Sequence, residues 1–402
     1  MAPRRPIYLD HHATTPLDPR VLEAMMPFLT DDFGNAASTT HVFGWRAEAA
    51  VEESRERIAS AIGARPKDIV FTSGATESNN IAMIGAARAA GLLGAGATPR
   101  AGRNHMVTLV TEHRAVLDPL AWLETQGVTI TRLGVDAEGL VDLQAVEDAI
   151  SERTLLVSVM MANNEIGVLQ DIAGIGALCR QRGVLFHSDA AQAVGRLSVD
   201  VEALQVDLLS VSFHKMYGPK GVGVLYARTR KPRARLAPLF HGGGHERGLR
   251  SGTLAVPLVV GGAAALDLCL AEQEVETKRL QDLRDRLWHR LEAELPEVRL
   301  NGHRDRRLAG NLNVSFPGVD GARLLLALSD IAVSSGSACS SADPQPSHVL
   351  SALGLSEALS RASLRFGLGR GTTPEDVDRA AERLIEEVRK GEMQAAAGAG
   401  TE

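Results

Sequence analysis

The sequence predicts an α/β protein whose larger domain is a mostly parallel β-sheet with helices on both faces. Short apolar runs alternate with amphipathic stretches of helical period across residues 68–226, which is typical of such a sheet. The 402 residues exceed what one hydrophobic core usually holds, so a second domain is expected. Polar residues recur where the predicted strands end, and ligands bind at that edge of an open α/β sheet.

Seven strands and the helices between them are predicted in order along the large domain. The strands cover residues 68–72, 106–111, 128–133, 155–161, 184–187, 206–211 and 222–226. The helices cover residues 21–29, 44–62, 75–90, 115–125, 143–150 and 172–182. A long helix over 258–295, strands over 311–316 and 332–335 and a helix over 377–390 then predict a smaller α+β domain.

The domain boundaries follow from the order of these elements. We expect residues 21–260 to form the large, ligand-binding domain. Residues 1–20 and 261–392 are expected to form the small domain, which carries a Gly/Ser loop around Cys339. Residues 393–402 are rich in alanine and glycine and are expected to be a disordered tail.

The composition is that of an ordinary soluble globular protein, with 45% hydrophobic and 23% charged residues. A net charge of -6 gives no electrostatic reason to expect nucleic acid or a membrane surface as a partner. The first residues, MAPRRPIYLDHH, lack the apolar segment of a secretory signal. No run approaches the roughly 18 apolar residues that span a bilayer. We therefore expect a cytoplasmic protein.

The three cysteines fall into two kinds. Cys179 and Cys269 lie in Leu/Ala-rich helical patterns, where they are expected to be buried small hydrophobes. Cys339 lies in SSGSACSSADP, a loop with no apolar periodicity to bury it. An exposed thiol in a cytosolic protein suggests a chemical role, although a neutral loop cysteine fits the pattern too.

A strand followed by a small-residue turn and a helix start presents backbone N–H groups to a phosphate. Residues 68–90 have this order, with Ala75 and Thr76 at the turn. An ordinary helix cap explains the same residues, so the pattern alone leaves both interpretations open. Lys215 follows the buried run 206–211, and its role also allows two interpretations. It is either a solvated loop lysine or an amine whose pKa desolvation lowers, which makes it nucleophilic toward an aldehyde.

An aldehyde cofactor with a phosphate and a pyridine ring would use these residues together, as in pyridoxal phosphate enzymes of the aminotransferase type. Lys215 would form the imine, Asp189 would keep the ring nitrogen protonated, and His113 would stack on the ring and move protons. The other candidates are hydrogen-bond donors: Ala75, Thr76, Ser212 and His214 toward phosphate, and Gln192 toward the phenolic oxygen. No metal site is expected, because no thiolate or carboxylate set completes one around His241 and His245.

Ordered motifs along almost the whole chain resemble the cysteine desulfurases of the IscS/NifS type. They are YLD, SGATESNN, TEHRAVL, NNEIGVLQDI, HSDAAQAVG, SFHKMYGPKGVG, HGGGHERGLRSGT, SSGSAC and SLRFGLGR. The resemblance implies the class V aminotransferase fold (fold type I), with a seven-stranded sheet and pyridoxal phosphate. It also implies a homodimer in which Thr253 contacts the phosphate in the partner's site.

The resemblance further implies the reaction and the roles of the remaining residues. L-cysteine would bind through Asn164 and Arg365, Asn164 also contacting the cofactor, and Lys215 would act as the base with help from His113. The Cys339 thiolate would attack the substrate sulfur, leaving a persulfide and releasing alanine. The spacing to Arg365 matches the long-loop branch, so a scaffold for iron–sulfur assembly or a tRNA-thiolating protein is expected to take the sulfur. Transient ligation of an iron–sulfur cluster by Cys339 belongs to the same expectation.

Two departures from the family pattern stand out. His11 and His12 replace the Tyr-Ser or Asn-Asn pair that commonly follows YLD. They either shape the substrate entrance or are exposed polar residues, and we expect the latter. The chain also ends soon after Lys390, without the extended segment by which IscS-type enzymes dock their scaffold.

Three other functions are compatible with parts of the pattern. A selenocysteine lyase or another enzyme of the class V aminotransferase fold would use the same lysine and aspartate. Transamination has no use for a nucleophilic thiol, so Cys339 argues against an aminotransferase. A non-catalytic sulfur-transfer adaptor would not need Lys215, Asp189, His113 and Cys339 together.

Overall fold

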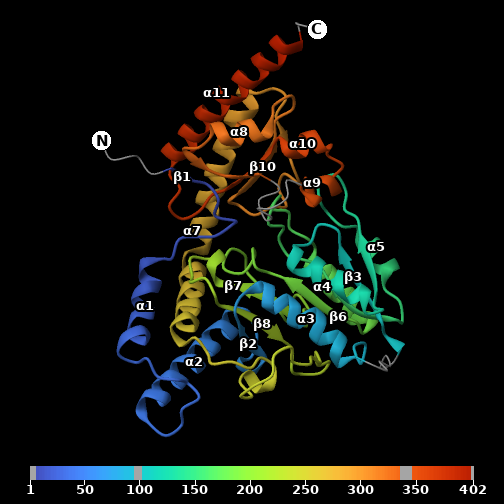
Figure 1. Ribbon diagram of the computed structural model, residues 1–402, viewed down its shortest axis with the longest axis vertical. Helices are drawn as coiled ribbons and strands as arrows, with labels where there is room; N and C mark the ends of the chain where they lie inside the picture. Colours follow the sequence, from blue (N-terminus) through green and yellow to red (C-terminus); the bar gives the residue numbers. More distant parts are fainter. Residues whose placement is uncertain (1–5, 95–101, 336–345, 400–402) are drawn as a thin grey trace.

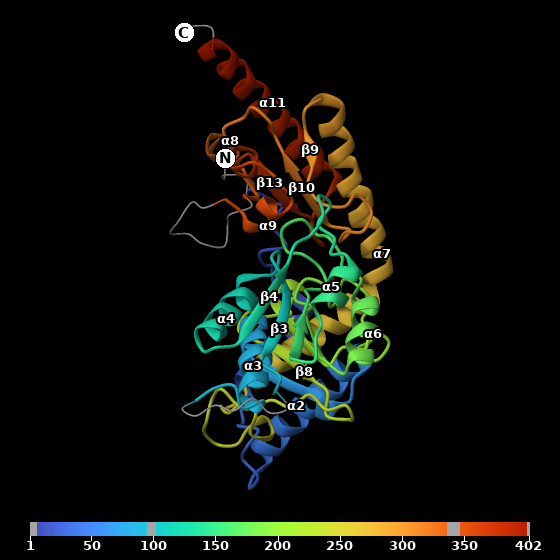
Figure 2. The same ribbon diagram turned by 90° about the vertical axis from the view of Figure 1, so that its right-hand side faces the viewer.

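The structure is a computed structural model that describes residues 6–94, 102–335 and 346–399. A large β-sheet with its helices forms the lower part of the molecule in Figure 1, and a smaller sheet forms the upper part. The long helix α7 (Val256–Glu294) runs along one side of both parts (Figure 2).

Seven strands form the large sheet, in the order β2-β8-β7-β6-β5-β3-β4. They are β2 (Ile69–Thr72), β3 (His105–Leu109), β4 (Thr129–Leu133), β5 (Thr154–Ser158), β6 (Leu185–Asp189), β7 (Leu208–Ser212) and β8 (Gly223–Ala227). Strand β8 is antiparallel to both of its neighbours, and the other pairs are parallel. The predicted mostly parallel, seven-stranded sheet is confirmed.

Helices cover both faces of this sheet, because successive strand residues point to opposite sides. In β2, Ile69 and Phe71 belong to one hydrophobic core and Val70 to the other. The first core contains residues of α2 (Val42–Ala61), α5 (Leu143–Ala149), α6 (Ile172–Arg182) and the start of α7. The second contains residues of α3 (Ala75–Ala89) and α4 (Arg114–Thr125), and α1 (Pro19–Thr30) packs on α7.

The smaller sheet is antiparallel and has a core of its own. Its strands are β9 (Arg299–Leu300), β10 (Asn311–Ser315), β12 (Ser334–Ser335) and β13 (Ser363–Gly367), in the order β12-β13-β10-β9. The core joins this sheet to α8 (Gly321–Ala327), α11 (Pro374–Ala399) and the end of α7. The N-terminal strand β1 (Ile7–Tyr8) pairs with β11 (Ile331–Ala332) beside it. These separate cores support the domain division, whose boundaries stay a prediction.

Several parts of the small domain differ from the expectations. Helix α11 continues to Ala399, well beyond 390, so most of the expected disordered tail is helical. Alanine is the strongest helix former, and the alanines after 394 continue the helix rather than end it. The sequence analysis also missed β13, α9 (His348–Ala352) and α10 (Glu357–Arg361). Helices α9 and α10 each span little more than one turn, which is too short to show a helical period.

One stretch of α7 is more apolar than expected. A window of this helix has a mean hydropathy of 1.4, which by length and composition would suffice to cross a membrane. Val256, Val259 and Ala263 of α7 are instead buried in the core of the large sheet. We therefore interpret α7 as a core helix.

A buried ion pair holds the glycine-rich loop around residues 241–252 against the edge of the large sheet. Arg55 of α2 donates from Nη2 to Glu246 Oε1 at 2.8 Å and from Nη1 to Oε2 at 2.9 Å. The backbone N–H of Phe71 in β2 also donates to Glu246 Oε2, at 2.8 Å. Both charged side chains are almost fully buried, with 4% and 2% exposed.

We predict that Glu246→Ala lowers the free energy of unfolding by about 3–5 kcal/mol, because it removes the buried carboxylate that faces the Arg55 guanidinium. Urea denaturation measures the change. Glu52→Ala is the matched control, since Glu52 pairs with the same arginine but is 55% exposed. That variant should lose about 1 kcal/mol or less. Equal losses in the two variants would contradict the role assigned to the buried pair.

Candidate active site

A cavity of about 580 Å³ lies at the carboxyl ends of the parallel strands. It brings together ten of the predicted site residues from both ends of the chain. They are Ala75, Thr76, His113, Asn164, Asp189, Gln192, Ser212, His214, Lys215 and Arg365. The expectation that these strand-end residues converge is met.

Lys215 lies in a short 3-10 turn, Phe213–Lys215, directly after β7. Its Nζ donates to the carbonyl oxygens of His12 and Ala13, each at 2.7 Å. The side chain is partly buried and lines the cavity. Lys215 is therefore not a solvated loop lysine, and its amine lies where an aldehyde ligand would meet it.

Asp189 ends β6 and presents a carboxylate of fixed orientation, with the residue only 5% exposed. Its Oδ2 accepts from Asn79 Nδ2 at 2.7 Å, and its Oδ1 accepts from the Ala191 N–H at 2.9 Å. The sequence analysis missed Asn79. The signal was present, because Asn79 follows Ala75 by one helical turn and so lies on the same face of α3.

His113 is the N-cap of α4, where its Nδ1 accepts from the Ala115 N–H at 3.0 Å. In the neutral ring the proton must then lie on Nε2. Burial lowers the pKa of His113, so this neutral form dominates at pH 7. Burial, with the nearby Lys215 and Lys220, likewise lowers the pKa of His214 to about 4. Both histidines thus serve as neutral donors or acceptors.

The start of α3 forms the end of the cavity suited to an anion. No side chain caps this helix, and Gly74, with φ 147, precedes it. Such a backbone angle favours glycine, which leaves the N–H groups of the first turn uncovered by a side chain. Ser212 and His214 line the same cavity. The arrangement offers several hydrogen-bond donors and a positive dipole end to a phosphate.

Arg365 reaches the cavity from β13 and is 4% exposed. Its Nη1 donates to the Asn164 carbonyl oxygen at 2.8 Å, and its Nη2 donates to Asp10 Oδ1 at 2.8 Å. Asp10 is a second residue to which the sequence analysis gave no role, although it belongs to the YLD motif. The guanidinium is held in one orientation, as a carboxylate-binding fork requires.

Two buried carboxyl groups adjoin site residues in the sequence. Burial raises the pKa of Glu112, next to His113, well above its usual range. Burial also raises the pKa of Glu165, next to Asn164, to about 7, although the hydrogen bond from Ser347 and the charge of Arg365 act to lower it. Near neutral pH both groups can therefore hold protons that ordinary glutamates release.

The expectation that His11 and His12 are exposed is wrong: they are 4% and 2% exposed. Their segment is held by distant partners, since Lys215 and Gln192 donate to the His12 carbonyl oxygen. Contacts between residues so far apart in the sequence cannot be predicted from the residues around either partner. Burial lowers the pKa of His12 well below its usual range, with Arg196 adding to the effect, so the ring is neutral.

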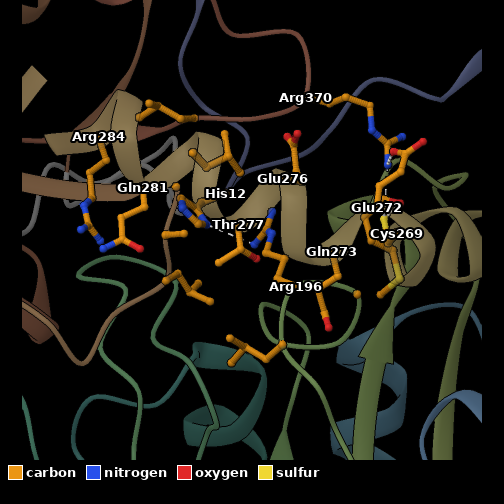
Figure 3. Close-up of a pocket in the computed structure, with 18 of the residues that line it drawn as sticks. His12, Arg196, Cys269, Glu272, Gln273, Glu276, Thr277, Gln281, Arg284 and Arg370 are labelled. Atoms are coloured by element: carbon orange, nitrogen blue, oxygen red, sulfur yellow. Dashed lines mark hydrogen bonds and ion pairs between the residues drawn. The ribbon is translucent and has the colours of Figure 1, made fainter. Parts of the chain in front are cut away.

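His12 also lines a second, smaller cavity of about 180 Å³ beside α7. Figure 3 shows Arg284 and Gln281 at one end of it and Arg370, Glu272 and Cys269 at the other. Arg370 is paired with Glu272 at 2.9 Å. None of the described residues that line this cavity is a lysine, so the amine chemistry belongs to the larger cavity.

Two predicted residues are not part of the described cavity. Thr253 is exposed and does not line it. Cys339 lies outside the described residues.

Cys179 and Cys269 are buried as expected. Within the described ranges, no group of three or more His, Cys, Asp and Glu side chains is placed to hold a metal ion.

Comparison with known proteins identifies the family. The model for aminotransferase class-V matches residues 7–380. The chain belongs to the class V aminotransferase family. It is 50% identical over 385 residues to the cysteine desulfurase IscS of Rickettsia akari, covering 96% of this chain and 92% of the relative. The predicted resemblance is confirmed, and every residue assigned to the site lies within the matched range.

Solved structures agree with this assignment. A structure titled NifS-like protein superposes with a TM-score of 0.86 at 34% identity, covering 96% of this chain and 99% of that one. A structure of SspA in complex with cysteine has a TM-score of 0.78 at 37% identity, covering 90% and 98%. This member of the class V aminotransferase family thus has the fold of the NifS-like proteins along nearly its whole length.

The pKa of Glu165 predicts a pH-dependent stability. Because the carboxyl pKa rises from 4.5 to about 7 on folding, the unfolded chain ionises first. The wild type should therefore lose about 3 kcal/mol of unfolding free energy relative to Glu165→Gln between pH 4.5 and pH 7, and little more above that. Urea denaturation across this range measures the slope. Glu23→Gln, at an exposed position on α1, should keep the wild-type slope. Parallel curves for the wild type and Glu165→Gln would contradict the raised pKa.

Proposed function

We propose that this protein removes sulfur from L-cysteine, giving L-alanine and a persulfide on Cys339. The observation that carries the proposal is that one cavity holds Lys215, Asp189 and Arg365 together. The amine, the carboxylate and the guanidinium are what amino-acid chemistry on an aldehyde cofactor needs. The curated relatives named cysteine desulfurase and the cysteine-bound structural neighbour support cysteine as the substrate.

The cofactor of the proposed reaction is pyridoxal phosphate. The cavity fits it, because Asp189 presents a fixed carboxylate and the uncapped start of α3 offers N–H donors for the phosphate. Ala75, Thr76, Ser212 and His214 would hold the phosphate, with Gln192 at the phenolic oxygen and His113 over the ring. Once bound, the cofactor supplies an aldehyde that condenses with amines and a ring that withdraws electrons from the substrate.

The chain's own residues bind the substrate and move its protons. Arg365, already oriented by Asp10 and the Asn164 carbonyl, takes the substrate carboxylate as a planar fork. Lys215 Nζ accepts the proton from the substrate Cα. His113 carries its proton on Nε2, and from that position it can donate to the substrate.

Cys339 performs the sulfur transfer. Its thiolate attacks the substrate sulfur, so that a sulfur–sulfur bond forms while the bond between that sulfur and Cβ breaks. The electron pair of the broken bond stays with Cβ, which gains one proton, equivalent to the proton that the Cys339 thiol loses, and the carbon skeleton leaves as alanine. A selenocysteine lyase is the alternative on the same residues. In the cytoplasm the persulfide sulfur would pass to an acceptor such as an iron–sulfur scaffold or a tRNA-thiolating protein.

The active unit is proposed to be a homodimer. Thr253, matched to the phosphate contact of the family, does not line this chain's own cavity and is exposed. Large apolar side chains are also exposed over α1, α2 and the loop between them: Leu22, Met26, Leu29, Phe33, Val42, Phe43 and Trp45. An exposed apolar surface of this kind marks an interaction site, and a second copy of the chain is the occupant that explains Thr253 as well.

The role of Cys339 predicts a separation of binding from sulfur release. Cys339→Ala should keep the visible absorbance of bound pyridoxal phosphate and its change on adding cysteine, but should form no persulfide. Lys215→Ala should lose the change with cysteine as well. Spectrophotometry and mass spectrometry of the protein measure the two steps. Sulfide release from Cys339→Ala at the wild-type rate would contradict the role of the thiol.

The position of Thr253 predicts complementation between subunits. Lys215→Ala and Thr253→Glu should each abolish alanine formation, the second because a carboxylate repels the phosphate. A mixed dimer of the two has one intact site, so co-expressed chains should regain about a quarter of the wild-type activity. Chains mixed without subunit exchange are the control. No recovery on co-expression would contradict a site completed by the partner.

A further inference from the structure

The smaller cavity beside α7 lies where segments of both sheets meet, and the proposed reaction does not use it. Residues 195–197 between β6 and β7, residues 307–310 before β10 and the middle of α7 line most of it. Figure 3 shows Arg196, Gln273 and Thr277 around it. Its volume of about 180 Å³ equals that of roughly six water molecules in the liquid, which leaves room for a small ligand.

Arg307 lines this cavity as a buried cation. The residue is 5% exposed, and its Nη2 donates to the carbonyl oxygens of Ile166 and Asn301 at 2.9 and 2.5 Å. Its Nε and Nη1 have no acceptor among the described residues, and no described carboxylate forms an ion pair with it. A buried charge of this kind is costly unless an anion lies beside it.

Arg196 is a second guanidinium group on the same cavity that no described carboxylate neutralises. It donates to the carbonyl oxygens of His11 and Lys215 at 3.1 and 2.9 Å and to Gln192 Oε1 at 2.6 Å. These oxygens accept hydrogen bonds but carry no net charge. Burial lowers the pKa of both guanidinium groups, that of Arg307 to about 9. An anion in the cavity would oppose this effect.

The acidic residues around the cavity do not supply that anion. Glu272 and Glu276 line it, but each accepts from an arginine outside the cavity at 2.7 Å. Asp305 is exposed and forms no ion pair within the part of the chain that the structure describes. The two guanidinium groups therefore leave the cavity with an excess of positive charge.

The rest of the wall is largely apolar, and Gln273 Nε2 adds one more buried donor without an acceptor in the described chain. The apolar residues are Leu197, Met216, Leu280, Leu308 and Leu368. Apolar walls with a few placed polar groups are typical of sites for small organic molecules. An inorganic ion would lose its hydration against these walls without gaining contacts that replace it.

We propose that this cavity binds a small organic carboxylate, with its charged group at Arg307, in the field of Arg196, and its short carbon chain against the leucines. Arginine and a carboxylate form charge-assisted hydrogen bonds, which the unpartnered N–H groups of Arg307 are free to make. The ligand would connect the segment after β6 with the segment before β10, and so the large sheet with the small one. The proposal does not depend on the reaction in the larger cavity.

The test measures the binding of propionate to the holoenzyme by isothermal titration calorimetry. Arg365 binds a carboxylate in the proposed function, so every protein in the series carries Arg365→Gln. Arg307→Met removes the buried charge. Its control is Arg304→Met, because Arg304 is exposed on the same loop and does not line the cavity. Thr277→Phe fills the cavity from α7, whereas Thr277→Ala leaves it open.

We expect one saturable site per chain, with an affinity about 10-fold or more weaker after Arg307→Met or Thr277→Phe. Arg304→Met and Thr277→Ala should keep the affinity. Should Arg307→Met fail to fold, Thr277→Phe decides the outcome. The proposal is overturned if no saturable binding occurs before these changes, since the cavity then holds water only, or if the affinity is equal after Thr277→Phe.

Sulfate separates an organic carboxylate from an inorganic oxyanion. It should bind about 10-fold or more weakly than propionate, because it has no hydrocarbon to bury against the apolar walls. Equal affinities would overturn the assignment to a carboxylate. A wild type that forms no alanine from cysteine, in a series where propionate binding still depends on Arg307, would instead remove the proposed function and leave this site in place.

Discussion

The structure depends on one constraint, that parallel strands end at the same edge of a sheet. Strands β3, β5, β6 and β7 run in the same direction, so the residues that follow them meet although they lie far apart in sequence. For this reason one cavity contains His113, Asn164, Asp189 and Lys215. Short turns after the strands are enough to bring these side chains together.

Much of this arrangement was predictable from the sequence, because most large-sheet strands are apolar runs and several site residues lie at or after the end of one. The parts that were not predictable depend on contacts between distant segments. Asp10 holds Arg365, and the carbonyls of His12 and Ala13 hold Lys215. Nothing within ten residues of His12 indicates that it is buried. Helix α9 was missed because little more than one helical turn shows no period.

The two buried carboxyl groups behind the site serve as hydrogen-bond acceptors. Glu112 Oε1 accepts from the Met160 N–H at 2.6 Å, and Glu165 accepts from Ser347. Each joins the end of one strand to a neighbouring element, where an apolar side chain would only fill space. Burying such groups is costly unless they are hydrogen-bonded, and in return the neighbouring His113 and Asn164 are held in place.

Helix α7 connects the two sheets mechanically. Its first turns lie in the core of the large sheet, and Leu283, Leu287 and Leu291 lie in the core of the small one. A single rod of 39 residues, about 58 Å long, therefore links the sheet that carries Lys215 to the sheet that carries Arg365. Any motion that separates the two sheets must therefore bend this helix or break the packing at one of its ends.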